Sequence, residues 1–339
     1  MQDALLYDRV EGANVLCRLC PWRCRIAPGE SGLCRVRENQ DGALYPLNYG
    51  LISAAAVEPI ERRGVYHLFP GSVLLTLGGW GDNLHCRFRP APPELPGVGE
   101  KQRYLDAERA IDFAVEHHCR GLAWGYQEPA VWLEYVLDSA KLARANGLFT
   151  LLLTRGFVSE EAIDLLGPYL DACAVEILAA SGQPYEQACG LPDWEAILRS
   201  TAHARERWRC HVEVHTPLIA GVNGEEEMLR GLASWIREKM GVDTPWHLLH
   251  FEPAGEMAGK PPASPAELER AQEVGREAGL RYVYVQSGEE AGLTHTLCPS
   301  CGQVLIRREG KFYVRIAGIE DGKCARCGQE IYLRRSIFK

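Results

Sequence analysis

The sequence predicts an α/β fold in which strands and helices alternate around a parallel sheet, with a cysteine-rich segment at each end. From Val73 onward, short apolar runs alternate with amphipathic stretches, which is the pattern of repeated βα units. The 339 residues and 46% apolar content suffice for one large core. We therefore expect a four-cysteine segment over residues 1–70, an α/β body over 71–290 and a C-terminal ribbon over 291–339.

Each expected strand is a short apolar or alternating run. The runs are residues 73–77, 121–124, 149–154, 172–177, 211–218, 246–251 and 281–285. Within residues 211–218, alternation places His211, Glu213 and His215 on one face of the strand and Val212 and Val214 on the other.

Helical periodicity fills the intervals between these strands. The expected helices are residues 106–116, 130–145, 159–166, 193–206, 225–239 and 265–277. Ser159 followed by two glutamates is typical of a helix start, and Gly147 and Gly279 are typical of helix ends. The Pro-rich run at 90–96 is expected to be a loop. Six or so strand–helix units are fewer than the eight of a closed barrel.

Charge and hydropathy exclude several classes of function. The net charge of −8 makes the surface repel polyanions, so nucleic-acid binding is not expected. The N-terminus has no basic region followed by an apolar run, and no uncharged apolar stretch approaches about 18 residues. We expect a cytoplasmic protein without a membrane segment. Among its 13 cysteines, the clustered pairs then indicate metal binding rather than disulfides.

The C-terminal region contains two Cys-x-x-Cys pairs. Cys298 and Cys301 form the first pair, and Cys324 and Cys327 form the second. Strand-like runs at 304–307 and 311–315 lie between them. Two such pairs on a β-hairpin are how a zinc ribbon builds a tetrahedral four-sulfur site. The spacing predicts structural zinc, with an iron–sulfur occupant as the alternative.

A second cysteine cluster lies near the N-terminus. Its members are Cys17, Cys20, Cys24 and Cys34, and Gly29 and Gly32 allow the chain to fold back between the last two. Four converging thiolates again suggest a structural zinc site, and because thiolates also suit iron–sulfur centres, an iron–sulfur centre is the alternative. The remaining four cysteines that lack partner spacing, Cys119, Cys173, Cys189 and Cys210, are expected to be small buried apolar residues.

Several motifs in collinear order give the chain a family resemblance. They include the N-terminal cysteine motif, Glu58-Pro-Ile-Glu-Arg-Arg63, Tyr66-His-Leu-Phe-Pro-Gly71, Gln127-Glu128-Pro129, Trp246-His247 and the C-terminal cysteine pairs. The chain resembles the AmmeMemoRadiSam system family of radical S-adenosylmethionine (SAM) enzymes, which is related to the pyruvate formate-lyase activating enzymes. This resemblance implies a partial (β/α)6 barrel of the radical SAM type and, as a possible partner, a Memo-like protein.

The family's cluster motif is altered in this chain. In the family, a strand leads into Gly-Cys-Asn-Phe-x-Cys-x-Phe-Cys, whose three thiolates hold a [4Fe–4S] cluster that binds SAM. Here Asp82, Cys86 and Arg89 stand at the three cysteine positions. A guanidinium cannot coordinate iron. The chain is therefore interpreted as a degenerate member, in which no SAM-ligating cluster is expected and SAM is not the expected cofactor.

Other positions at the mouth of the expected barrel also depart from the family pattern. Glu128 matches the acidic residue that the family places in its SAM pocket, whereas Arg155 replaces an asparagine and Glu176 begins a run that loses a lysine. His215 and His250 are further departures near the same strand ends, together with His85 and Glu252. We expect Glu128, Arg155, Glu176, His215 and His250 to line a pocket for a small polar ligand or a metal.

Two hypotheses about function follow. The first is a zinc-containing barrel that binds a ligand or a protein partner without cleaving SAM reductively. The second is an active enzyme, either a redirected metal-dependent catalyst at the barrel mouth or a radical SAM enzyme with atypical cluster ligation. The sequence does not name a substrate.

Overall fold

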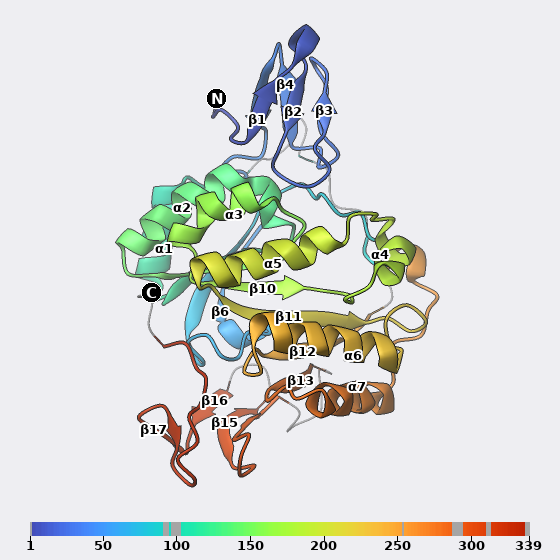
Figure 1. The fold of residues 1–339 in the computed structure, drawn as a ribbon. Helices are drawn as coiled ribbons and strands as arrows, with labels where there is room; N and C mark the ends of the chain where they lie inside the picture. The colour runs from blue at the N-terminus through green and yellow to red at the C-terminus, as the bar shows by residue number, and fades with distance from the viewer. Residues whose placement is uncertain are drawn as a thin grey trace.

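The computed structural model describes residues 2–90, 95, 103–252, 254–286, 294–309 and 313–335. Most of the Pro-rich run at 90–96 and the expected boundary at 290/291 therefore lie outside the described residues, as does part of the run at 311–315. The described chain forms an α/β body between two small cysteine-bearing modules (Figure 1).

One eight-stranded sheet forms the centre of the body. Its spatial order is β13-β12-β11-β10-β9-β8-β7-β6, and the neighbours from β7 to β13 are parallel. The strands are β7 (Val73–Gly78), β8 (Gly121–Gly125), β9 (Phe149–Thr154), β10 (Ala172–Glu176), β11 (His211–Leu218), β12 (Trp246–His250) and β13 (Val283–Gln286). The edge strand β6 (Ala54–Pro59) runs antiparallel to β7, and the sequence analysis did not anticipate it. Closure of this sheet into a partial barrel stays a prediction.

Helices follow the parallel strands, as the alternating pattern predicted. They are α1 (Ala107–Glu116), α2 (Leu133–Ala145), α3 (Glu160–Leu166), α5 (Glu195–Trp208), α6 (Glu226–Trp235) and α7 (Pro265–Glu277). An additional short helix, α4 (Gly182–Cys189), lies after β10. Ser159 caps α3 by accepting a hydrogen bond from the Ala162 amide, 3.2 Å away. In the described part of the chain, no helix combines the length and apolar character needed to cross a membrane.

The two faces of the sheet are covered differently. The helices pack on one face, and the segment after β6, which includes the 3-10 turn η2 (Ile60–Arg63), packs on the other. There the Phe69 ring stacks on Phe149, with ring centroids 4.7 Å apart. Because other parts of the chain, rather than water, cover both faces of the sheet, the central strands are apolar on both sides.

The N-terminal module consists of short antiparallel strands. β1 (Tyr7–Arg9), β2 (Val15–Cys17) and β3 (Arg25–Ile26) form one sheet, and β4 (Arg37–Gln40) pairs with β5 (Ala43–Pro46). In Figure 1 this module lies at the opposite end of the molecule from the C-terminal strands.

The C-terminal module is the second set of short strands. It contains β14 (Thr296–Leu297), β15 (Val304–Glu309), β16 (Tyr313–Ile316), β17 (Ile319–Glu320) and β18 (Lys323–Cys324). The Arg308 side chain joins the module to the body by donating to the Tyr66 carbonyl at 2.8 Å. The expected division into three parts, with boundaries at 70/71 and 290/291, stays a prediction.

Candidate functional site

A polar pocket opens at the carboxyl ends of the parallel strands, where α/β proteins usually bind ligands. Its volume is about 850 Å³. We call it the strand-end pocket. It is lined by Arg35, Arg62, Arg63, Gly64, Asp82, Leu84, His85, Cys86, Arg87, Arg89, Pro90, Tyr126, Gln127, Glu128, Leu153, Thr154, Arg155, Ala174, Glu176, His215, Leu249, Gly255, Glu256 and Gln286.

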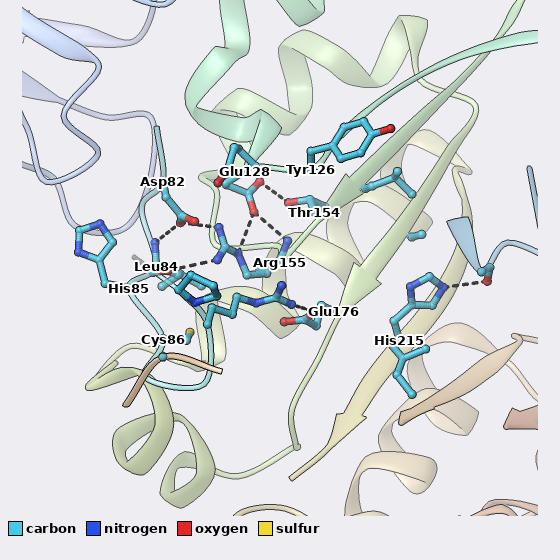
Figure 2. A pocket seen from close by; sticks show the side chains of 18 of the residues that line it. Asp82, Leu84, His85, Cys86, Tyr126, Glu128, Thr154, Arg155, Glu176 and His215 are labelled. Atoms are coloured by element: carbon cyan, nitrogen blue, oxygen red, sulfur yellow. Dashed lines mark hydrogen bonds and ion pairs between the residues drawn. The ribbon is translucent and has the colours of Figure 1, made fainter. Parts of the chain in front are cut away.

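Asp82, at the first cluster position, forms an ion pair with Arg155 (Figure 2). Its carboxylate also accepts a hydrogen bond from the Leu84 amide at 2.8 Å. Burial by itself lowers the pKa of Arg155, but the charges of Asp82 and Glu128 outweigh it and raise that pKa above its ordinary value. Arg155 is therefore a permanent cation at the centre of the pocket wall.

Glu128 holds the other side of the same guanidinium. Its carboxylate accepts from the Thr154 hydroxyl at 2.6 Å, the Ala130 amide at 3.1 Å and the Arg155 amide at 2.9 Å. The Arg155 Nε lies 3.5 Å away. Glu128 is buried, and both of its oxygens are already engaged by the protein.

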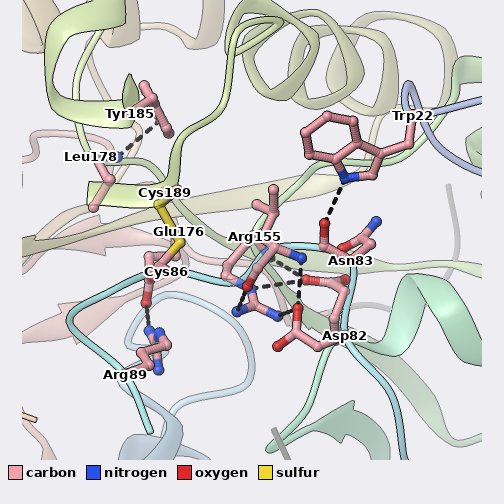
Figure 3. The surroundings of a disulfide bond; sticks show 12 residues. Trp22, Asp82, Asn83, Cys86, Arg89, Arg155, Glu176, Leu178, Tyr185 and Cys189 are labelled. Carbon is pink, nitrogen blue, oxygen red and sulfur yellow. Dashed lines mark hydrogen bonds and ion pairs between the residues drawn. A yellow bond between two sulfur atoms is a disulfide. The ribbon is translucent and has the colours of Figure 1, made fainter. Parts of the chain in front are cut away.

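Cys86, at the second cluster position, forms a disulfide with Cys189, the last residue of α4 (Figure 3). The expectation that Cys189 is a small buried residue without a partner is therefore wrong. The two cysteines are 103 residues apart, so spacing along the chain could not reveal the pair. The disulfide ties the loop after β7 to α4 across the rim of the pocket.

Arg89, at the third position, forms an ion pair with Glu176 at the end of β10. Glu176 is the register partner of His215 in the neighbouring strand β11. The His215 Nε2 donates to the Gly64 carbonyl at 3.0 Å, which leaves Nδ1 as the unprotonated nitrogen. Burial, assisted by His247, lowers the pKa of His215 to about 3, so the imidazole is neutral at physiological pH.

His250 does not line the pocket, in contrast to the expectation. On β12, Leu249 lines the pocket and His247 lies in a buried network on the same face. Because side chains alternate along a strand, His250 points to the opposite face, and it is exposed. Glu252 is exposed beyond the strand end and is likewise absent from the lining.

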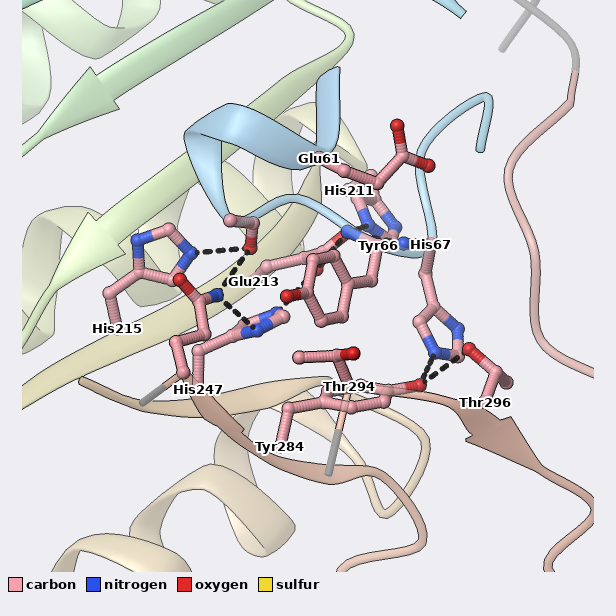
Figure 4. A network of polar contacts seen from close by, with 12 residues as sticks. Glu61, Tyr66, His67, His211, Glu213, His215, His247, Tyr284, Thr294 and Thr296 are labelled. Carbon is pink, nitrogen blue, oxygen red and sulfur yellow. Dashed lines mark hydrogen bonds and ion pairs between the residues drawn. The ribbon is translucent and has the colours of Figure 1, made fainter. Parts of the chain in front are cut away.

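A buried polar network lies beside the pocket (Figure 4). Glu213 is fully buried and accepts hydrogen bonds from the backbone amides of Tyr66 and His67 at 2.9 and 2.8 Å. It also contacts His211 Nε2 at 2.9 Å and His247 Nε2 at 2.7 Å. Burial raises the pKa of Glu213, but these histidine hydrogen bonds outweigh it and hold that pKa well below its ordinary value. The network anchors the segment after β6 to β11.

Sequence reasoning missed several residues of the pocket. Tyr126 adopts φ = 64° although it is not glycine, and the Arg63 guanidinium lies 4.1 Å from its ring centroid. A left-handed conformation at an aromatic residue costs roughly 1–3 kcal/mol, and such residues often lie at functional sites. Arg62 and Arg63 also line the pocket, and the sequence pointed to them only as part of the motif Glu58-Pro-Ile-Glu-Arg-Arg63.

The two cysteine clusters differ in geometry. In the described part of the chain, only one group of three or more possible metal ligands has all its donor atoms within 4.8 Å of one another. This group is Cys298, Cys301, Cys324 and Cys327. That group can hold a metal ion. The N-terminal Cys17, Cys20, Cys24 and Cys34 line one shared cavity but are spaced more widely.

Comparison with known proteins identifies relatives of the whole chain. No family model matches the sequence. The chain is 30% identical to the uncharacterized protein MJ0808 of Methanocaldococcus jannaschii over 340 aligned residues, which cover 98% of this chain and 99% of the relative. It belongs to the family of that protein.

More distant relatives identify the superfamily. The chain is 25% identical to the choline trimethylamine-lyase activating enzyme of Oleidesulfovibrio alaskensis, over 75% of this chain and 86% of the enzyme. The structure of a radical SAM methyltransferase from Sphaerobacter thermophilus has the same fold, with a TM-score of 0.50 and 18% identity over 70% of this chain and 71% of the methyltransferase. The family of this chain thus lies in the radical SAM superfamily, beside the lyase-activating enzymes.

Proposed function

We propose that this chain uses the radical SAM fold to bind a small anionic ligand in the strand-end pocket, without a SAM-cleaving iron–sulfur cluster at residues 82–89. One observation carries the proposal: each of the three cluster positions is engaged otherwise. Asp82 pairs with Arg155, Cys86 is joined to Cys189, and Arg89 pairs with Glu176. These residues do not fit a cluster, because iron in such clusters takes thiolate ligands.

The charge of the lining supports an anionic ligand. Six arginines line the pocket, against the four carboxylates of Asp82, Glu128, Glu176 and Glu256 and a fifth, Glu58, that pairs with Arg62 and Arg63 from outside the lining. This cationic excess lies in a chain whose net charge is −8. A concave wall with that excess concentrates anions, and the guanidinium fork matches carboxylate and phosphate oxygens.

SAM itself is not the ligand that these contacts favour. Glu128, which the resemblance places in a SAM pocket, already accepts hydrogen bonds from three backbone or hydroxyl groups and from Arg155. A bound amino group would have to displace those donors. This argument supports a different occupant of the inherited pocket.

The ribbon cysteines support a structural zinc ion. Their sulfurs approach in two pairs, Cys298 with Cys327 at 3.5 Å and Cys301 with Cys324 at 3.7 Å. Four thiolates around one point are a closed tetrahedral zinc site, which has no open position for a substrate.

Within the superfamily, the collinear motifs favour the AmmeMemoRadiSam system family, and a Memo-like protein is the partner that we propose on this ground.

An enzyme is the alternative function. The observation that favours it is the register pair of Glu176 and His215 in the pocket, because a carboxylate beside a neutral imidazole can move protons. A metal-dependent catalyst has less support, since the pocket's imidazoles and carboxylates do not converge as the ribbon cysteines do in the described chain.

Titration calorimetry with pyrophosphate and citrate tests the ligand proposal. We expect one site per chain, with an affinity that Arg89→Gln lowers about tenfold, because the change removes a cation and leaves Glu176 unpaired. Arg199→Gln is the matched control, since Arg199 forms surface ion pairs outside the pocket. Absence of binding by both anions, or equal loss in the two variants, would contradict the proposal.

A further inference from the structure

The N-terminal cysteines surround a second, much smaller cavity. It has a volume of about 10 Å³ and lies between Cys17, Cys20, Cys24 and Cys34. Cys17 and Cys20 are buried, and Cys24 and Cys34 are half-buried. The cavity has room for a single ion or water but not for a cluster of several irons and sulfides.

The backbone around these cysteines repeats the local geometry of the C-terminal ribbon. In the ribbon, a left-handed glycine follows the second cysteine of each pair, with φ = 72° at Gly302 and 74° at Gly328. In the N-terminal module, Arg35 directly after Cys34 adopts the same conformation, with φ = 61°. Glycine adopts this conformation freely and arginine does not, so the fold imposes the turn at Arg35.

Backbone amides also point at the sulfurs in both modules. The Trp22 amide hydrogen-bonds to the Cys20 sulfur and the Val36 amide to the Cys34 sulfur, each from two residues further along the chain. The Arg326 amide reaches the Cys324 sulfur of the ribbon in the same way. Such hydrogen bonds stabilise negative charge on metal-bound sulfur.

A buried, unpartnered donor is the independent sign of a ligand. The Arg37 side chain is fully buried and lines the same cavity. Its terminal nitrogens donate to Glu134, at 3.0 Å, and to the Leu5 carbonyl. Its Nε has no hydrogen-bond partner within the described chain. A buried N–H group without a partner lowers the stability of the fold unless a group in the cavity accepts a hydrogen bond from it.

We propose that Cys17, Cys20, Cys24 and Cys34 bind one zinc ion as four thiolates, with Arg37 Nε–H as a donor to the sulfur shell. Four thiolates around a divalent ion carry a net charge of −2, and the positive edge of Arg37 opposes that charge. Because the sulfurs of the described structure are more widely spaced than those of the ribbon, binding draws the side chains together around the ion.

This zinc site also holds one wall of the strand-end pocket. The Trp22 Nε1 donates to the Asn83 carbonyl at 2.8 Å, next to Asp82 in the loop after β7. A Cβ added at Gly81 would meet Val36 at 2.6 Å and the Cys34 carbonyl at 3.0 Å, so this loop lies directly against the cysteine turn. Arg35 from that turn lines the pocket. The ion thus stabilises the segment that presents both Asp82 and Arg35.

Metal analysis of the full chain by mass spectrometry tests the proposal. Purified protein is expected to contain about two zinc ions per chain. Cys20→Ser and Cys301→Ser should each retain about one, and Cys119→Ala should retain both, because Cys119 is a buried free cysteine outside the two clusters. One zinc per chain, unchanged by Cys20→Ser, would overturn the proposal. An iron–sulfur absorption that Cys20→Ser abolishes would also overturn it.

A second set of measurements begins with the wild-type protein. Wild-type protein titrated with a mercurial thiol reagent should release its zinc as eight cysteines react, four for each ion. Cobalt in place of zinc should give the visible spectrum of tetrahedral thiolate coordination at two ions per chain, and at one in Cys301→Ser. Cobalt binding that disappears completely in a folded Cys301→Ser chain would count against the N-terminal site.

Discussion

Arg155 shows how one residue organises the wall of the strand-end pocket. Its guanidinium joins Asp82 to Glu128, so both carboxylates belong to one ion-pair network. Such a buried pair is stable only when its remaining hydrogen-bond sites are filled, and the amides of Leu84, Ala130 and Arg155 fill them. Asp82 and Arg155 are therefore physically coupled.

Buried neutral histidines predict a stability that depends on pH. Burial lowers the pKa values of His67 and His215 to about 3 in the folded chain, whereas unfolded histidine titrates near about 6.5. Unfolding thus takes up a proton at each residue below that pH. The free energy of unfolding should be fully maintained above about pH 6.5 and fall by roughly 1.4 kcal/mol per pH unit and histidine as the pH decreases toward 3.

Urea denaturation at pH 7.5, 6 and 5 measures this dependence. In His215→Gln, the free energy of unfolding should depend less steeply on pH, by the contribution of one histidine. His203→Gln, whose side chain is only 23% exposed but lies in surface ion pairs with Glu160 and Asp164, is the matched control. A free energy of unfolding that stays constant from pH 7.5 to 5 would contradict the assignment of neutral buried imidazoles.

At the scale of elements, periodicity predicted most of the body. The expected strands at 149–154 and 211–218 coincide with β9 and β11, and the expected helix at 265–277 coincides with α7, because these segments combine regular patterning with clear boundaries. α4 was missed because it has only eight residues, lies a short loop after β10, and lacks a strong apolar stripe. The position of His250 near a strand end had suggested that it lines the pocket. In the structure, the alternation of side chains along β12 places it on the other face of the strand.

Pairings between distant elements were beyond the reach of the sequence. The Cys86–Cys189 disulfide and the Arg308 contacts join segments that no local pattern connects. The hydrogen bonds from Tyr66 and His67 to Glu213 span 147 and 146 residues. Only the assembled sheet brings these groups together, so the site's residue types could be predicted while its partnerships could not.

The disulfide predicts an element-level effect on stability. Removing it with Cys189→Ala should lower the free energy of unfolding by roughly 2–4 kcal/mol, because a cross-link across 103 residues restricts the unfolded chain. Thermal unfolding with and without dithiothreitol measures this. The reductant should destabilise Cys119→Ala as it does the wild type but leave Cys189→Ala unchanged, and equal sensitivity of the two variants would argue against the cross-link.

For the whole molecule, the cysteine modules lie at the two ends of the body, and Arg308 is one attachment of the ribbon, beside the backbone hydrogen bonds that join Arg334 to His67 and Phe69. It is buried and donates to the Thr294 carbonyl, the Thr296 hydroxyl and the Tyr66 carbonyl. Its guanidinium lies 4.1 Å from the Tyr66 ring centroid. These contacts connect the ribbon to the same segment that Glu213 anchors to β11.

Arg308→Met should therefore loosen the ribbon without dissolving its metal site. We expect faster limited proteolysis between the body and Thr294, an unchanged zinc content and a loss of roughly 2–4 kcal/mol in the free energy of unfolding, because buried acceptors lose their donor. Arg307→Met is the control, since Arg307 is exposed on the same strand. Proteolysis at the wild-type rate would show that Arg308 does not hold the ribbon in place.

The loss of reductive SAM cleavage is the central claim, and one assay tests it directly. The full chain is reduced to free Cys86, reconstituted anaerobically with iron and sulfide, and incubated with dithionite and SAM. We predict no 5′-deoxyadenosine above the level of Cys86→Ala, because Asp82 and Arg89 supply no thiolate. Sustained production of 5′-deoxyadenosine that depends on Cys86 would contradict the account.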